Sequence, residues 1–187
     1  MNYTIKPLTE ETSHIFIDYL GNLDFSHAPH WSTCFCRYYH STCSLDEWMK
    51  RTGTQNQNEA LQEISSGTMK GYLIFDQETC IGWCNANDVR NYARLQNEVA
   101  HLLEDKKIGC VICYVIHPKY RGQGVARALL KQAIIDFRTN GFNAVVAFPF
   151  KSGSSQTMYR GTYHMYEEQG FVEIKGNENQ TTMWLDL

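Results

Sequence analysis

The chain has 187 residues with a formal net charge of −3, and 43% of its residues are hydrophobic. This length suffices for one domain with a sizeable core, and the charge gives no electrostatic reason to expect nucleic acid as a partner. No apolar run approaches the roughly 20 residues that a membrane-spanning helix needs. We therefore predict a single domain over residues 1–187, without a nucleic-acid or membrane partner.

Cysteine usage and the N-terminal residues bear on the cellular compartment. The seven cysteines are an odd number and do not resemble a disulfide framework, which favours a reducing environment. The first residues show no basic stretch followed by an apolar one, so no signal peptide is expected. These features together predict a cytoplasmic protein.

The first part of the chain alternates between short elements. Residues 3–7 have the alternation of a strand, and Thr9 with Thr12 can begin a helix that reaches Tyr19 or Leu20. Residues 69–76 and 80–85 read as two strands that a short turn joins into a hairpin.

Residues 21–67, which lie between these elements, are less regular and rich in aromatic side chains. Short helices are predicted at residues 45–50 and 59–64. The aromatic cluster fits two interpretations: the wall of a pocket for a small ligand, or a satellite core beneath a long loop.

Cys34, Cys36, His40 and Cys43 bring metal-binding side chains close together in the sequence. Thiolates and imidazole are suitable zinc ligands, but structural zinc sites usually separate paired cysteines by two to four residues. Buried free cysteine also packs as a small hydrophobic residue. We therefore favour packing and expect no metal.

Residues 85–103 form a connection that is longer than a usual hairpin turn, and long connections in compact domains are often functional. The ionisable side chains in and next to it either face a substrate or line a solvated helix; they are Asp88, Arg90, Arg94, Glu98, His101 and Glu104.

The most informative segment begins with the β-branched run at residues 108–116, which predicts a buried strand. Gly122 and Gly124 follow and allow a tight turn with uncovered backbone N–H groups. A helix over residues 124–140 comes next and stops at Gly141; its apolar face comprises Val125, Leu129, Ala133, Ile134 and Phe137. A strand, bare amides and a helix N-terminus together form a site for a phosphate-bearing ligand.

The glycine spacing in this segment restricts the class of phosphate-bearing ligand that the loop can bind. A Walker loop would need Gly-x-x-x-x-Gly-Lys-Ser/Thr, which is absent, and a dinucleotide fingerprint would need a small residue where Arg127 stands. The remaining pattern, Arg121-x-x-Gly124-x-Ala126 after a strand, resembles the acetyl-CoA signature of the GNAT superfamily of N-acetyltransferases.

The last part of the chain strengthens this resemblance. Residues 143–148 are predicted to form a strand, and residues 156–169 a helix that carries Tyr159, Tyr163 and Tyr166 at helical spacing. Within it, Tyr166-Glu-Glu-Gln-Gly-Phe171 resembles the second marker of the family. Residues 171–175 and 181–187 close the chain as a hairpin around Gly176-Asn177. The resemblance covers residues 69–187, and residues 1–20 more weakly.

The resemblance implies a fold class of α/β (α+β) type: a central mixed, mostly antiparallel, twisted sheet of about seven strands with helices on both faces. Residues 108–140 would be the acetyl-CoA-binding strand, loop and helix, and residues 21–67 the variable segment on the acceptor side. The implied cofactor-binding residues are Tyr114, Val115, Arg121, Gly122, Gln123, Gly124, Val125 and Ala126.

The resemblance also implies the reaction, which is transfer of the acetyl group of acetyl-CoA to a primary amine of a small molecule or peptide by direct attack on the thioester. Tyr166 would be the general acid, because an ordinary phenol stays protonated at neutral pH. Trp31, Trp83 and Asp88 are candidates for acceptor contacts, and Asp88, Glu98 and His101 for the general base.

One residue departs from the family pattern. Many members have an asparagine seven residues before the tyrosine, where this chain has Tyr159. A non-catalytic acyl-CoA-binding module therefore stays open as the alternative to an enzyme. The acceptor is not readable from the sequence, and the oligomeric state stays open between a monomer and a homodimer.

Overall fold

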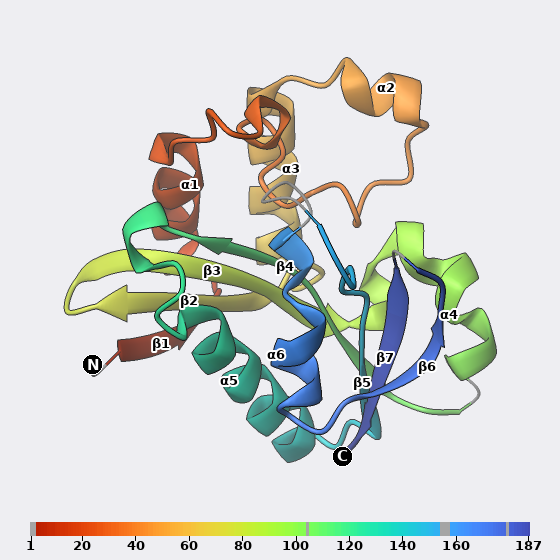
Figure 1. Ribbon diagram of the computed structural model, residues 1–187. Coiled ribbons are helices and arrows are strands. Elements are labelled where there is room, and N and C mark those ends of the chain that lie inside the picture. The colour runs from red at the N-terminus through yellow and green to blue at the C-terminus, as the bar shows by residue number, and fades with distance from the viewer. Residues whose placement is uncertain (1–2, 104, 154–157, 179) are drawn as a thin grey trace.

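The computed structural model describes residues 3–103, 105–153, 158–178 and 180–187, and it contains one seven-stranded sheet (Figure 1). The strand order is β1-β2-β3-β4-β5-β7-β6; β4 and β5 run parallel and all other neighbours are antiparallel. The strands are β1 Tyr3–Pro7, β2 Gly71–Asp76, β3 Thr79–Asp88, β4 Ile108–Ile116, β5 Ala144–Ala147, β6 Val172–Gly176 and β7 Thr181–Asp186. The predicted mixed, mostly antiparallel sheet is confirmed.

Helices cover both faces of this sheet. The α-helices are α1 Ser13–Asn22, α2 Leu45–Met49, α3 Gly53–Ser65, α4 Gln96–Leu103, α5 Val125–Thr139 and α6 Tyr163–Glu167. Short 3₁₀ turns are η1 Pro29–Trp31, η2 Val89–Asn91, η3 Ala93–Leu95, η4 Pro118–Tyr120 and η5 Met158–Arg160. In Figure 1, α5 and α6 lie in front of the sheet, whereas α1 and α3 lie beyond its upper edge. No helix among the described residues is long and apolar enough to cross a membrane.

Strand alternation separates the two main cores. Leu73 and Phe75 of β2 pack in the cluster under α1 and α3, and Ile74 between them packs in the cluster under α5. Successive side chains of a strand point to opposite faces, so a strand that is apolar at every position is buried on both. A third cluster, which joins α4 and η2 to β4 and β5, includes Ile108 and Val146.

Helix α5 is positioned by its predicted apolar face. All five residues of that face are buried, and full burial of a leucine side chain such as Leu129 contributes about 2 kcal/mol. Opposite its last turns, β4 carries Gly109, where an added Cβ would lie 2.7 Å from the Phe137 ring. A side chain at Gly109 would therefore push α5 away from the sheet. Gly141 ends the helix with a φ of 70°, as the sequence predicts.

Two predicted boundaries in the front half are corrected. Helix α3 begins at Gly53 rather than near residue 59, because Thr52 and Gln55 form a capping box that starts it earlier. The predicted long loop at residues 85–103 is ordered: β3 continues to Asp88, and η2, η3 and α4 fill the rest.

The predicted helix over residues 156–169 is wrong. Residues 154–157 lie outside the described part of the chain, η5 follows at Met158–Arg160, and α6 covers only Tyr163–Glu167. Gly161 has a φ of 80°, which breaks the helix, and the Thr162 side chain caps α6 by accepting from Met165 N–H over 3.3 Å. Tyr159 and Tyr166 therefore do not share a helical face.

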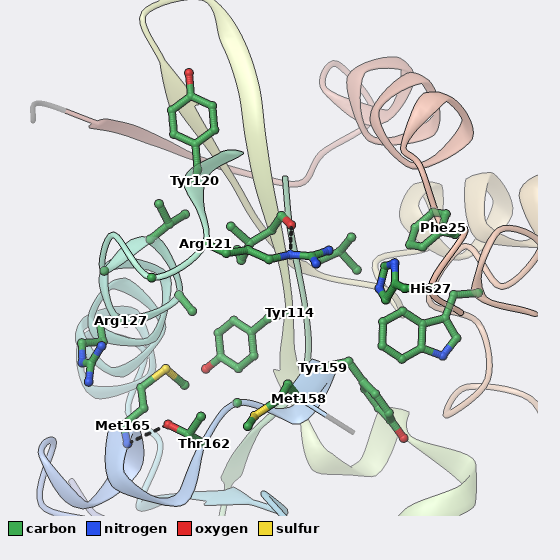
Figure 2. Close-up of a pocket in the computed structure, with 18 residues that line it drawn as sticks. Phe25, His27, Tyr114, Tyr120, Arg121, Arg127, Met158, Tyr159, Thr162 and Met165 are labelled. Carbon is green, nitrogen blue, oxygen red and sulfur yellow. Dashed lines mark hydrogen bonds between the residues drawn. The ribbon is translucent and has the colours of Figure 1, made fainter. Parts of the chain in front are cut away.

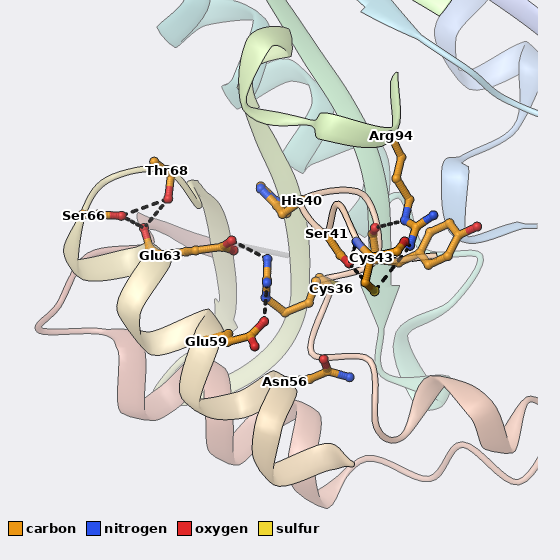
Figure 3. A network of polar contacts seen from close by, with 12 residues as sticks. Cys36, His40, Ser41, Cys43, Asn56, Glu59, Glu63, Ser66, Thr68 and Arg94 are labelled. Atoms are coloured by element: carbon orange, nitrogen blue, oxygen red, sulfur yellow. Dashed lines mark hydrogen bonds and ion pairs between the residues drawn. The ribbon is translucent and has the colours of Figure 1, made fainter. Parts of the chain in front are cut away.

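Residues 21–67 are anchored to the domain by polar and apolar contacts. The buried Arg37 guanidinium forms ion pairs with Glu59 and Glu63 of α3 (Figure 3). Asn56 Nδ2 donates to the Thr33 carbonyl over 2.8 Å. Apolar side chains of this segment, such as Phe35, pack in the same cluster as β2 and β3. The segment is thus integral to the fold.

Candidate active site

The loop between β4 and α5 has the backbone conformation that the sequence predicts. Gly122 and Gly124 have φ angles of 74° and 81°, and Gly124 is the N-cap of α5. A Cβ at either position would meet nothing within 4 Å, so the left-handed backbone is what requires glycine here. The first-turn N–H groups of α5 have no acceptor within the helix, and the helix dipole adds about half a positive charge there. This loop can bind an anion.

Strand β4 has an unpaired edge next to the loop. Its pairing with β5 ends at Val111 and Ala147, whereas its pairing with β3 continues to Ile116. Among the described strands, none pairs with the β5 side of residues 112–116. An extended ligand arm could hydrogen-bond to this edge as an added strand does.

A cavity of about 360 Å³ lies where the open edge meets the loop (Figure 2). Seven of the eight predicted cofactor-binding residues line it: Tyr114, Val115, Arg121, Gly122, Gly124, Val125 and Ala126. Gln123 does not, because its side-chain amide turns back and donates to the Lys119 carbonyl over 2.6 Å. The structure therefore brings most of the predicted cofactor site together; we call this space the loop cavity.

Arg121 supplies positive charge to the loop cavity. Its Nε donates to the Ile116 carbonyl over 3.1 Å, which holds the exposed guanidinium along the cavity in Figure 2. Arg127 also lines the cavity, but its guanidinium is paired with Glu168 at 2.6 Å, a contact that ties α5 to the end of α6. Arg121 is thus the better placed of the two to meet a phosphate.

Tyr166 lies behind the cavity wall. It is fully buried and is not among the lining residues; its hydroxyl donates to the Arg160 carbonyl over 2.9 Å and lies 3.4 Å from the Tyr114 hydroxyl. Burial raises the pKa of Tyr166 well above the usual value, and it does the same for Tyr114. Both phenols are therefore protonated at neutral pH, and Tyr114 is the one that faces the cavity.

A second cavity of about 360 Å³ adjoins the first, and we call it the aromatic cavity. Four residues line both spaces: Phe25, Trp31, Val115 and Tyr159. The other walls come mainly from residues 34–49, and they include Phe35, Tyr38, Tyr39 and Trp48. Residues 21–67 thus pack in the core and also line a cavity, and the interpretation of this cavity as a pocket for a small ligand stays a prediction.

The three predicted acceptor residues separate in the structure. Trp31 lines both cavities, and its ring meets that of Tyr159 edge-on at 5.3 Å. Trp83 is fully buried against Phe16, and Asp88 accepts from Arg90 N–H at the start of η2. Trp83 lies outside both cavities because it is on the face of β3 that packs in the core. Asp88 lies outside them because it is at the end of β3, beyond the site.

The candidate bases proposed from the sequence lie elsewhere too. Asp88, Glu98 and His101 line neither cavity, and the last two are exposed on α4. The histidines that do line a cavity are His27 in the loop cavity and His30 in the aromatic cavity. Figure 2 shows His27 beside Phe25, across the cavity from α5.

Sequence reasoning also missed Arg160 and Gly161. Arg160 lines the aromatic cavity, and at Gly161 an added Cβ would lie 2.5 Å from Met165 Cε and 3.0 Å from the Tyr166 ring. The helix breaker Gly161 followed by the cap residue Thr162 was the available signal. It indicates that Tyr159 and Arg160 precede the helix instead of belonging to it.

The cysteine and histidine cluster of residues 34–43 does not converge on one point. Cys36 Sγ lies 3.7 Å from Cys113 Sγ and accepts from Trp83 Nε1, Cys43 Sγ contacts Ser41, and His40 Nε2 lies 3.2 Å from the Asn85 amide. Among the described residues, no group of three or more His, Cys, Asp or Glu side chains could hold a metal ion.

Comparison with known proteins agrees with this geometry. The model of the acetyltransferase (GNAT) family matches residues 30–171, although no curated protein sequence matches the chain. Among solved structures, the polyamine N-acetyltransferase of Drosophila melanogaster that forms N-acetylagmatine has 11% identity and a TM-score of 0.62, with all of both chains covered. A mosquito arylalkylamine N-acetyltransferase-like protein has 14% identity and a TM-score of 0.61, again with full coverage of both.

A third structure carries a ligand. The PaiA N-acetyltransferase of Thermoplasma acidophilum, solved with coenzyme A, has 14% identity and a TM-score of 0.55, with all of both chains covered. Identities this low show a shared fold alone, whereas the family model spans most of the chain. The chain therefore belongs to the GNAT family of acetyltransferases, which use acetyl-CoA as their acetyl donor.

Proposed function

We propose that the protein binds acetyl-CoA in the loop cavity and transfers its acetyl group to a primary amine that enters from the aromatic cavity. The observation that carries this proposal is the coincidence of three features in one space: left-handed Gly122 and Gly124 at the start of α5, the open edge of β4, and Arg121. The first holds a pyrophosphate, the second an extended pantetheine arm, and the third a further phosphate.

In the proposed reaction, the amine nitrogen attacks the thioester carbonyl carbon directly. The carbon–sulfur bond breaks, the thiolate leaves, and the nitrogen gives up a proton as the amide forms. Backbone N–H groups near Tyr114 and Val115 would polarise the carbonyl, and one such donor can contribute about 3 kcal/mol to transition-state stabilisation. The adjoining cavities support this route, because Val115 lines both and an acceptor beside it can reach the thioester.

The proposed proton donor to the thiolate is Tyr166, acting directly or through the Tyr114 hydroxyl that lies 3.4 Å away. Burial raises the pKa of both phenols, so each carries a proton at neutral pH, and the position of Tyr114 in the loop cavity supports the route through its hydroxyl. His27 is the proposed acceptor of the amine proton, since it is the histidine in the loop cavity.

The test is titration calorimetry with acetyl-CoA, followed by measurement of free-thiol release against a panel of primary amines. Binding with thiol release for one class of amine is the expected result. Binding without release from any amine would favour the non-catalytic acyl-CoA-binding module. No binding would contradict the assignment of the loop cavity.

A further inference from the structure

The chemistry of the aromatic cavity bears on which amine it accepts, an inference that rests on the proposed function. Aromatic side chains form much of its wall, and none of its lining residues is an aspartate or glutamate. Its charged lining residue is Arg160, from η5. A cationic head group would therefore find aromatic rings but no carboxylate there.

The Arg160 guanidinium is held in place without an anionic partner. Its Nη2 donates to the Tyr39 hydroxyl, and its Nη1 lies 3.4 Å from the Phe148 carbonyl oxygen. The guanidinium carbon lies 4.7 Å from the centre of the Phe150 ring and 5.6 Å from that of Tyr159. No carboxylate of the described residues pairs with it.

Two other arginines in the chain are neutralised by carboxylates, whereas Arg94 is held by the Tyr38 and Cys43 carbonyls. Buried Arg37 has two carboxylates, Glu59 and Glu63, and Arg51 has Glu59. A buried charge is unfavourable unless it is paired and hydrogen-bonded. Arg160, which lies in the cavity wall, keeps a positive charge that no described carboxylate neutralises. Its Nε is buried without an acceptor, so a ligand would meet the guanidinium at the remaining N–H groups of Nη1 and Nη2.

The phenols beside Arg160 extend the set of donors. The Tyr39 hydroxyl accepts from Arg160 and lies 3.0 Å from the Tyr159 hydroxyl. Burial raises the pKa of Tyr39, so its hydroxyl keeps a proton, which it can donate to Tyr159. The Tyr159 proton is then free to point into the cavities that this side chain lines. The Arg160 guanidinium and the Tyr159 hydroxyl therefore offer hydrogen-bond donors to the aromatic cavity, and no carboxylate lines it.

We infer that the acceptor is an amine that also carries a carboxylate, an amino-acid-like molecule with an apolar or aromatic body. The carboxylate binds Arg160 and the Tyr159 hydroxyl, the body lies against Trp31 and the other aromatic walls, and the amine points toward Val115. A planar guanidinium can donate two parallel hydrogen bonds to a carboxylate. One guanidinium balances the single negative charge of the carboxylate, and the phenol donates one further hydrogen bond. A polyamine would place a second cation beside Arg160.

The first arm of the test measures binding with two probes of similar size and opposite charge, 3-phenylpropionate and phenethylamine. Calorimetry on the whole protein should show the carboxylate binding at least about 10-fold more tightly than the amine. Arg160→Gln should abolish this preference, and Arg160→Lys should restore part of it because the charge returns without the fork. Arg138→Gln, which removes an exposed arginine at the far end of α5, is the charge-matched control and should change nothing.

The second arm compares turnover of phenylalanine with that of phenethylamine in the same variants. The selectivity ratio in kcat/KM should favour phenylalanine in the wild type and approach one in Arg160→Gln, a change that a purely structural role of Arg160 would not produce. Acetyl-CoA affinity, measured alongside, should be the same in both. If Arg160→Gln fails to fold, the inference is tested by the selectivity ratio of the wild type and by its change in Arg160→Lys.

The outcomes separate this inference from the proposed function. If acetyl-CoA binds but phenethylamine binds as tightly as 3-phenylpropionate, or neither probe binds, the carboxylate site is refuted and the loop cavity assignment stands. If acetyl-CoA does not bind while 3-phenylpropionate does, and Arg160→Gln removes that binding, the proposed function fails and the anion site stands.

Discussion

Gly124 illustrates how a single residue can serve the site rather than the fold. Its φ of 81° caps α5, and the space around its missing side chain is open. Residue spacing in the sequence is enough to identify this position, because the turn and the helix that need it are local. The conformations of Gly122 and Gly124 were therefore predictable from the sequence.

We predict that Gly124→Glu lowers acetyl-CoA affinity by about 100-fold or more, since a side chain and a negative charge would occupy the phosphate position. Gly141→Glu is a matched control, with a φ of 70° and equally open surroundings at the other end of α5. Both variants should lose similar thermal stability, and calorimetry should show lost binding in Gly124→Glu alone. Equal affinity in the two variants would contradict the assignment of the loop.

The two buried phenols provide a second residue-scale test. We predict that Tyr166→Phe lowers kcat by about 100-fold while acetyl-CoA affinity stays constant, because a general acid acts after binding. Tyr114→Phe distinguishes the route of the proton: a similar loss indicates that the proton passes through Tyr114, and a small one that Tyr166 acts directly. Unchanged turnover in both variants would remove the pair from the mechanism.

At the scale of elements, the sequence predicts those whose periodicity is local. The strands, α5 and the final hairpin follow their apolar patterns closely. The helix at residues 156–169 was wrong because tyrosines at helical spacing outweighed the break at Gly161. The sequence offered residues 21–67 as a pocket wall but did not indicate the opposite side of the aromatic cavity. That side comes from Cys113 and Val115 of β4 and from residues 159–160, which only tertiary packing brings to this segment.

Gly161 therefore yields a prediction about the start of α6. Gly161→Ala should destabilise the protein by about 2 kcal/mol, because strain at a φ of 80° adds to a clash of the new Cβ with Met165 and Tyr166. Gly170→Ala is the control: its φ is 87°, but the nearest atom to a Cβ is 3.6 Å away. Urea unfolding should show a clearly smaller loss in the control. Equal losses would mean that the backbone strain alone matters.

For the whole molecule, the same core holds the sheet and residues 21–67 together. Phe35 and Ala60 pack in one cluster with Leu73 and Trp83, and the single domain over residues 1–187 stays a prediction. His40 lies at this junction, 8% exposed, with its ring tilted against that of Tyr92 at 4.8 Å and hydrogen-bonded to Asn85. Burial and the charge of Arg37 lower the pKa of His40 from 6.5 to about 4.

This shift makes global stability depend on pH. The folded protein resists protonation of His40, so its contribution to the free energy of unfolding is complete above pH 6.5 and is lost as the pH falls toward 4. At about 1.4 kcal/mol per pKa unit, the loss is on the order of 3 kcal/mol. Chemical unfolding of the wild type and His40→Gln at several pH values should show a flatter profile in the variant. His101→Gln, an exposed histidine on α4, should keep the wild-type profile; a parallel profile in His40→Gln would refute the prediction.

The partition that the two cavities share has a thermodynamic consequence. Four side chains line both spaces: Phe25, Trp31, Val115 and Tyr159. If a ligand in one cavity moves these side chains, it therefore changes the affinity of the other cavity for its own ligand. Linkage makes the effect reciprocal: the factor by which the donor changes acceptor affinity equals the factor by which the acceptor changes donor affinity. A substitution at Trp31 would therefore alter both dissociation constants and the coupling between them, and affinities measured for either ligand alone would understate what the ternary complex gains or loses.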